Sequence, residues 1–130
     1  MLATSIHKIL KNDEKTSTFF IGVFARDRLP NLKKKKCCLV LNTDSHEKPG
    51  EHWLAIYLDE NGFGEFFDSY ANNPERFGLI NYLNKNCRIW TYNKQIIQGN
   101  SNFCGYYCVL FLLFRARNKA NKFFSYSIHH

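Results

Sequence analysis

The sequence predicts a single domain that combines short β-strands with three helices. Its 130 residues are enough to bury one sizeable hydrophobic core. Hydrophobic residues make up 45% and charged residues 22%, as in ordinary globular proteins. Apolar runs bounded by polar turns predict strands, and apolar residues at helical spacing predict helices. The expected strands cover residues 19–24, 37–42, 52–58, 63–68 and 87–92.

Each expected helix has a recognisable start or end. Ser5 is a suitable N-cap for a short helix near the beginning of the chain. Asn73-Pro74 predicts a second start, because proline is favoured at the first helical position. The third helix, over residues 104–119, is apolar and ends in basic residues, which suit the negative end of a helix dipole.

The chain is basic, with 18 Lys and Arg against 11 Asp and Glu and a formal charge of +7. Much of the excess lies in Arg26, Arg28 and the run Lys33 to Lys36. Such a balance favours polyanionic partners, above all nucleic acid. A solvated basic loop is an equally good interpretation of this cluster.

The five cysteines form neither an even disulfide framework nor a C-x-x-C pair, so we expect free thiols and no metal site. The first ten residues lack the apolar run of a signal peptide, and the apolar run 103–114 is too short to cross a bilayer. A reducing intracellular compartment is therefore expected. At most one of Cys37 and Cys38 should be exposed, since they alternate on a strand, and Cys108 is expected in the core.

A predicted hairpin brings two polar residues together. Asn61-Gly62 separates two aromatic and aliphatic runs, which is a strong hairpin signal. His52 begins the first run and Asp68 ends the second, so the turn places their side chains close to each other. The sequence therefore predicts a His–Asp pair.

Cys104 lies where a polar loop meets the apolar third helix. Backbone N–H groups at a helix N-terminus stabilise a thiolate, so this cysteine is a candidate nucleophile. Gly105 is expected to leave room for a peptide carbonyl beside the sulfur, and Gln98 to supply an oxyanion donor together with the Cys104 N–H. With His52 as base and Asp68 orienting it, these residues form the set that a cysteine hydrolase needs.

Each residue alone has an ordinary alternative. A histidine at a strand edge is more often a packing residue, a cysteine on an apolar helix is usually core, and Asp68-Ser69 and Gln98-Gly99 are plausible turns. The convergence of hairpin, loop and helix start on one cleft favours the hydrolase.

The same motifs resemble adenain, the adenovirus endoprotease, and the related proteases of Maverick/Polinton elements. More distantly, they resemble the ubiquitin-like-protein proteases. The resemblance covers roughly residues 6–114 and depends on His52-Trp53, on Asp68 within Phe-Phe-Asp-Ser-Tyr, and on Gln98 to Cys104-Gly105. It implies an α+β, papain-like core of the adenain type, with a mixed central sheet flanked by helices and the nucleophile at a helix N-terminus. His52, Asp68 and Cys104 would be the catalytic triad, and Gln98 would lie in the oxyanion hole. Trp53 would form part of the wall of the site.

The resemblance also implies substrates and activators. Adenain-like enzymes cut viral precursor proteins near small glycine-containing sites, use DNA as a cofactor, and are activated by a short peptide. Cys87 aligns with the cysteine that binds this peptide through a disulfide, although a buried strand cysteine is the favoured interpretation. We expect a monomer acting in the nucleus or virion, with no cofactor that the sequence itself requires.

Two departures from adenain matter. Asp68 stands where adenain has Glu, and the Gln98-to-Cys104 interval is one residue shorter; both features match the ubiquitin-like-protein proteases. Residues 1–130 are taken as one protease domain. Adenain continues beyond the nucleophile helix, whereas this sequence ends soon after it, so truncation at the C-terminus is one interpretation. An isopeptidase and an inactive remnant or basic nucleic-acid-binding module therefore remain alternatives.

Overall fold

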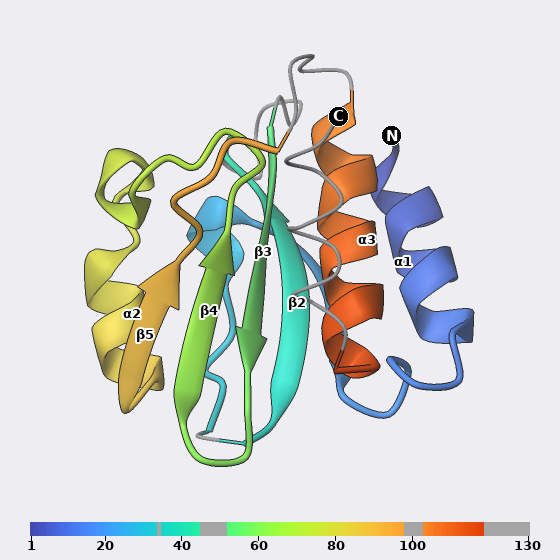
Figure 1. Cartoon of the computed structure of the whole chain (residues 1–130), viewed down its shortest axis with the longest axis horizontal. Coiled ribbons are helices and arrows are strands. Elements are labelled where there is room, and N and C mark those ends of the chain that lie inside the picture. Colours follow the sequence, from blue (N-terminus) through green and yellow to red (C-terminus); the bar gives the residue numbers. More distant parts are fainter. Residues whose placement is uncertain (34, 45–51, 98–102, 119–130) are drawn as a thin grey trace.

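The structure is a computed structural model that describes residues 1–33, 35–44, 52–97 and 103–118 (Figure 1). Within these ranges the chain forms three α-helices, two short 3-10 helices and five strands. In chain order they are α1 (Ala3–Asn12), β1 (Phe20–Ala25), η1 (Arg26–Arg28), β2 (Cys37–Asn42), β3 (Trp53–Leu58), β4 (Phe63–Phe67), η2 (Pro74–Phe77), α2 (Ile80–Asn86), β5 (Ile89–Tyr92) and α3 (Cys104–Ala116).

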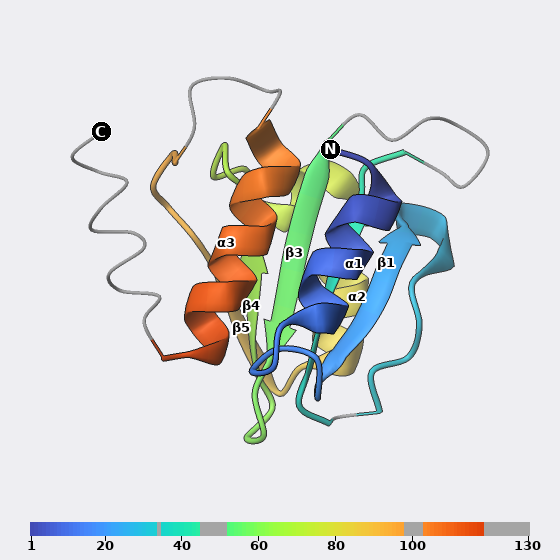
Figure 2. The same cartoon turned by 90° about the vertical axis from the view of Figure 1, so that its right-hand side faces the viewer.

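The five strands form one mixed sheet in the order β1-β2-β3-β4-β5. The outer pairs, β1 with β2 and β4 with β5, are parallel, whereas the pairs of β3 with β2 and β4 are antiparallel. Helices α1 and α3 cover one face and α2 covers the other, as Figures 1 and 2 show. The predicted α+β domain with a mixed sheet between helices is confirmed at this level.

The hydrophobic core is divided between the two faces of the sheet. Alternate residues of β2 and β3 point to opposite sides: Val40 and Ala55 pack toward α1 and α3, and Leu39 and Leu54 pack toward α2. Because both faces are covered, every residue of β3 is buried. This also explains why both Cys37 and Cys38 are buried, although they lie on opposite faces.

Two helix boundaries differ from the sequence prediction. The prediction of Ser5 as an N-cap is wrong: α1 begins at Ala3, and the amide of Ser5 donates to the Leu2 carbonyl within the first turn. The helix expected to run on from Asn73-Pro74 is broken in two. Gly78 adopts φ 71, a left-handed conformation that ends η2 before α2 begins.

The hairpin between β3 and β4 is confirmed, but its turn is wider than Asn61-Gly62. The Asp59 carboxylate accepts hydrogen bonds from the amides of Asn61 and Phe63, at 2.8 and 2.9 Å. Within this turn only Gly62 has a positive φ, so the turn is not of the type I′ form, which needs two such residues. The wider turn leaves the strand pairing, and thus the approach of His52 to Asp68, unchanged. Among the described residues, no helix is long and apolar enough to cross a membrane.

Candidate active site

The β3–β4 hairpin brings His52 and Asp68 into contact. Ala55 pairs with Phe67, so the same register carried one step further sets Asp68 opposite Leu54 and diagonal to His52. His52 Nε2 lies 2.6 Å from Asp68 Oδ1. The Asp68 side chain is fully buried and the His52 side chain is 15% exposed, which leaves one edge of the imidazole open to solvent.

Every hydrogen bond of the Asp68 carboxylate has this group as the acceptor. Oδ1 accepts from the amide of Tyr70 at 3.0 Å as well as pairing with His52. Oδ2 accepts from Asn72, through its side-chain Nδ2 at 2.8 Å and its backbone amide at 3.3 Å. This set of donors holds the pKa of Asp68 below its usual value, although burial acts in the opposite direction.

Asn93 fixes the backbone at Asp68. Its side chain accepts from the Asp68 amide at 3.0 Å and donates to the Asp68 carbonyl at 2.7 Å, as a neighbouring strand would. The pairing of β4 with β5 thus continues through a side chain beyond Tyr92. Asn72 and Asn93 were not singled out from the sequence, because an asparagine in a polar loop gives no signal beyond a turn.

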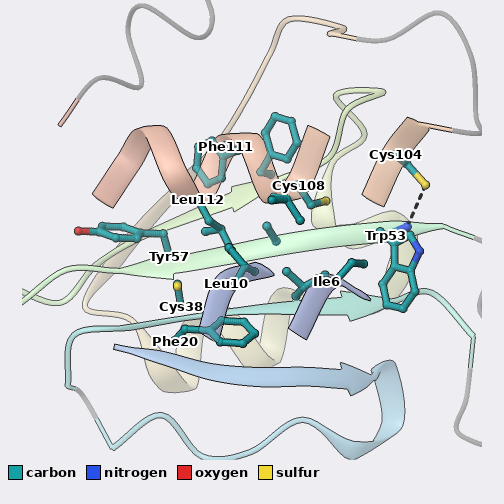
Figure 3. Packing of buried hydrophobic residues seen from close by; sticks show 14 of the residues in the cluster. Ile6, Leu10, Phe20, Cys38, Trp53, Tyr57, Cys104, Cys108, Phe111 and Leu112 are labelled. Atoms are coloured by element: carbon teal, nitrogen blue, oxygen red, sulfur yellow. Dashed lines mark hydrogen bonds between the residues drawn. The ribbon is translucent and has the colours of Figure 1, made fainter. Parts of the chain in front are cut away.

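Cys104 is the first residue of α3, beside the start of β3. The backbone amide of Trp53 donates to its Sγ at 3.3 Å (Figure 3). Phe103, at the N-cap, makes no side-chain capping bond and so does not compete with the thiol for the first-turn amides. The cysteine is buried, with 3% of its surface exposed.

The protonation states of His52 and Cys104 are coupled. Burial acts to lower the His52 pKa, but hydrogen bonds and charge interactions with Asp68 and Cys104 raise it to about 9. Burial acts to raise the Cys104 pKa, but it is lowered by hydrogen bonds from His52 and from the Trp53 and Gly105 amides and by the His52 charge. Because Nε2 faces Asp68, the other ring nitrogen is the one available to Cys104. These two shifts act in the direction of a thiolate–imidazolium pair.

Gly105 packs directly against Trp53. A Cβ at this position would lie 2.8 Å from Trp53 Cδ1, so the missing side chain makes room for the indole, and its role in leaving room for a substrate carbonyl stays a prediction. The indole Nε1 also donates to the Met1 carbonyl at 3.2 Å. Trp53 is therefore held between α3 and the start of the chain, and its amide stays beside the sulfur.

Gly105→Ala is expected to reduce the reactivity of the Cys104 thiol. The new methyl group must push the Trp53 indole away, which weakens the amide-to-sulfur bond and costs about 1–3 kcal/mol of overpacking. Alanine also raises helix propensity by about 1 kcal/mol, which offsets part of the packing cost. The melting temperature should therefore change little, whereas the alkylation rate should fall. A double variant with Trp53→Phe, whose smaller ring leaves space, should recover part of the rate. If Gly105→Ala alkylates like the wild type, this packing does not position the sulfur.

Asn72→Ala is expected to lower kcat/KM about tenfold, because Asp68 loses one charge-assisted hydrogen bond. The pKa of Asp68 should rise, because the Asn72 side chain no longer stabilises the carboxylate, and the acid limb of a pH profile of Cys104 alkylation would measure this change. Asn73→Ala is the matched control, since Asn73 accepts from the Glu75 amide and has no hydrogen bond to Asp68. Equal effects of the two substitutions would mean that Asn72 acts only on loop stability.

Of the remaining predicted site residues, Gln98 falls outside the described residues, so its role as an oxyanion donor stays a prediction. Cys87 follows α2 and is 8% exposed, and burial raises its thiol pKa to about 11, which disfavours the thiolate that disulfide exchange needs. Cys108 is fully buried in the core, as expected. Among the described residues, no group of three or more His, Cys, Asp or Glu side chains could hold a metal ion.

The site combines a histidine–aspartate pair with a thiol of lowered pKa, the groups that a cysteine hydrolase uses. Known proteins agree with that class. The chain is 30% identical over 112 residues to a protease of Bovine adenovirus 2. The alignment covers 74% of this chain and 54% of the relative. It is 28% identical over 115 residues to a protease of Porcine adenovirus A serotype 3, covering 75% of this chain and 56% of the relative.

A third relative comes from a giant virus. A protein of Acanthamoeba polyphaga mimivirus, named as a putative thiol protease, is 29% identical over 85 residues, covering 57% of this chain and 28% of the relative. No family model matches the chain. The resemblance to adenain-like cysteine proteases is thus confirmed: the chain is a relative of viral proteases. It spans about half the length of the adenovirus relatives it matches.

Proposed function

We propose that this chain carries the catalytic centre of a cysteine endopeptidase that cuts precursor proteins of a virus or transposable element. The observation that carries the proposal is the half-buried imidazole of His52, bonded at 2.6 Å to Asp68 and coupled to a thiol of lowered pKa at the start of α3. The viral proteases among the relatives support the class of substrate. Preference for small, glycine-containing sites is carried over from the resemblance.

In the proposed reaction the Cys104 thiolate attacks the carbonyl carbon of the scissile bond, and an electron pair moves to the carbonyl oxygen. The Cys104 N–H and the Gln98 amide are the proposed donors to this oxygen. The His52 imidazolium protonates the amine as the C–N bond breaks, leaving a thioester. His52 then takes a proton from water, which hydrolyses the thioester, while Asp68 stabilises the imidazolium in both steps.

The test is cleavage combined with labelling. The full chain, incubated with peptides that contain Gly-Gly, should release two products, and iodoacetamide near neutral pH should modify Cys104 before the other four cysteines. Mass spectrometry of the digested protein identifies the labelled residue. Cleavage that survives Cys104→Ala, or a thiol with no enhanced alkylation, would contradict the proposal.

A second candidate is an isopeptidase that removes a ubiquitin-like modifier. Asp68, in the position where adenain has Glu, favours it. A panel of modifier vinyl esters separates the two functions, because an isopeptidase should couple one of these probes to Cys104 while the short peptides stay intact.

Activation by DNA or by a peptide bound at Cys87 belongs to the proposal through the resemblance alone, as does action in the nucleus or virion. Adding DNA or a cysteine-containing peptide to the cleavage assay tests both activators. The non-enzymatic alternative, an inactive basic module, predicts salt-sensitive DNA binding without an activated thiol.

A further inference from the structure

A groove of about 400 Å³ lies along the outer edge of the sheet, between β1 and the segment that connects β1 to β2. Its lining includes Phe20 at the start of β1, Cys37 at the start of β2 and Lys11 near the end of α1. The parallel strands β1 and β2 end where antiparallel β3 begins, next to His52. Most of the groove therefore lies away from the candidate active site, and the proposed reaction does not use it.

The rim of the groove is cationic. Four exposed lysines line it, and none of the described lining residues is Asp or Glu; the lysines are Lys11, Lys33, Lys35 and Lys36. No salt bridge involving these lysines is present among the described residues. Lys11 Nζ donates to the Phe20 carbonyl at 3.5 Å and Lys36 Nζ lies over the Phe19 ring, contacts that leave both positive charges unneutralised. Ser17 and Thr18 add hydroxyl groups to the same lining.

The floor of the groove is apolar. Phe20 and Leu32 are almost fully buried beneath it, Phe24 is half-buried, and Ile21 is 42% exposed. A hollow of this kind accepts an aliphatic or aromatic side chain. The combination of an apolar floor and a rim of lysines suits a ligand that carries carboxylates around one apolar group.

We propose that this groove docks an acidic segment of a protein partner, whose Asp and Glu side chains meet the lysines while one apolar side chain enters the hollow. The contact runs through side chains and not through an added strand, because β1 carries a register shift between Phe20 and Gly22 that interrupts its edge. This binding does not depend on the proposed catalysis.

The geometry favours a peptide over nucleic acid. Two of the three rings that line the groove are engaged in ring contacts: Phe19 meets Tyr57 edge-on with centroids 5.8 Å apart, and Lys36 Nζ lies 4.6 Å from the centroid of the Phe19 ring. Phe20 similarly packs edge-on with His7. These rings therefore do not offer free faces for base stacking, on which single-strand binding relies. The described rim contains lysines and no arginine, the residue whose fork matches phosphate oxygens.

The experiment measures fluorescence anisotropy with the full-length Cys104→Ala chain, which cannot cleave the probe by the proposed mechanism. The probe is a labelled peptide of Glu and Asp with one central Phe; the comparisons are the same peptide with Gln and Asn, one with Ala for Phe, and an oligothymidine of equal length. We expect the acidic Phe peptide to bind more tightly than the other two peptides and than the oligothymidine. Lys33→Glu with Lys35→Glu should weaken it at least about tenfold.

The matched control is Lys8→Glu with Lys15→Glu, which changes the net charge equally at exposed lysines outside the groove. Equal losses of peptide affinity in the two double variants would overturn the proposal. So would a failure of the acidic peptide to bind, or tighter binding of the oligothymidine that depends on Lys33 and Lys35. Hydrogen exchange on the Cys104→Ala chain that keeps all its lysines adds an independent measurement. The bound peptide should protect amides in residues 17–24 and 35–37, and protection elsewhere alone would contradict the assignment.

Discussion

Replacing Asp68 with asparagine is expected to lower kcat/KM by about 10²- to 10⁴-fold, the range of effects seen when the orienting residue of a triad is lost. The buried carboxylate accepts from His52, the Tyr70 amide and both nitrogens of Asn72. Asparagine has one oxygen and one NH₂ group in place of the two carboxylate oxygens. Its NH₂ group must therefore face the donors on one of the two sides, where it cannot accept a hydrogen bond. Either His52 is held in the wrong tautomer or Asn72 loses its acceptor.

The pH dependence should change in a defined direction. In the wild type the His52 pKa is raised to about 9 and the Cys104 pKa is lowered, so the ion pair exists between these two values. Without the Asp68 charge, burial should take the His52 pKa down and the Cys104 pKa up. The pH profile of Cys104 alkylation measures both changes. Glu75→Gln, which removes an exposed carboxylate on η2, is the control.

The same pair has a consequence for stability. Because the folded pKa of His52 is raised, its contribution is complete below the unfolded value near 6.5 and is lost as pH rises through about 9. Asp68 has a lowered folded pKa, so its contribution is present above the unfolded value of 3.8 and is lost as pH falls through the folded one. Asp68→Asn should flatten both limbs of the stability profile. A variant that keeps the wild-type profiles and rate would show that Asp68 does not support the imidazole.

Much of the site was predictable because it depends on chain-local signals. A hairpin fixes the relation of His52 to Asp68 through register alone, so the prediction of their proximity did not depend on the detailed form of the turn. Cys104 at a helix start follows from the change from polar to apolar sequence. The burial of Cys37 and Cys38 on opposite faces, in contrast, depends on helices packing from both sides, which a six-residue run does not reveal.

The residues that sequence reasoning missed act through tertiary contacts. Asn72 and Asn93 become meaningful only after the chain has folded around Asp68. The packing of Gly105 against the Trp53 indole was not predicted, because that indole comes from β3, 52 positions earlier. Gly78 breaks a helix that spacing alone would continue, since its left-handed backbone is set by the local cap.

Phe111→Ala is expected to destabilise the fold by about 3–5 kcal/mol, a large share of the roughly 5–15 kcal/mol that stabilises a typical domain. The Phe111 ring is 1% exposed and stacks on Phe67, with centroids 4.7 Å apart and an interplanar angle of 6°. Alanine leaves a cavity between β4 and α3 that the rigid sheet cannot close. Urea unfolding followed by circular dichroism measures the loss.

This contact also links the two halves of the site, because Phe67 precedes Asp68 on the β4 side and Phe111 lies on the same helix as Cys104. Well below the unfolding midpoint, Phe111→Ala should therefore slow Cys104 alkylation beyond what the unfolded fraction explains. Phe103→Ala is the matched control for stability, since that ring is 52% exposed at the N-cap of α3 and should change the free energy of unfolding by less than about 0.5 kcal/mol. If the two substitutions destabilise equally, the stacked pair does not hold α3 against the sheet.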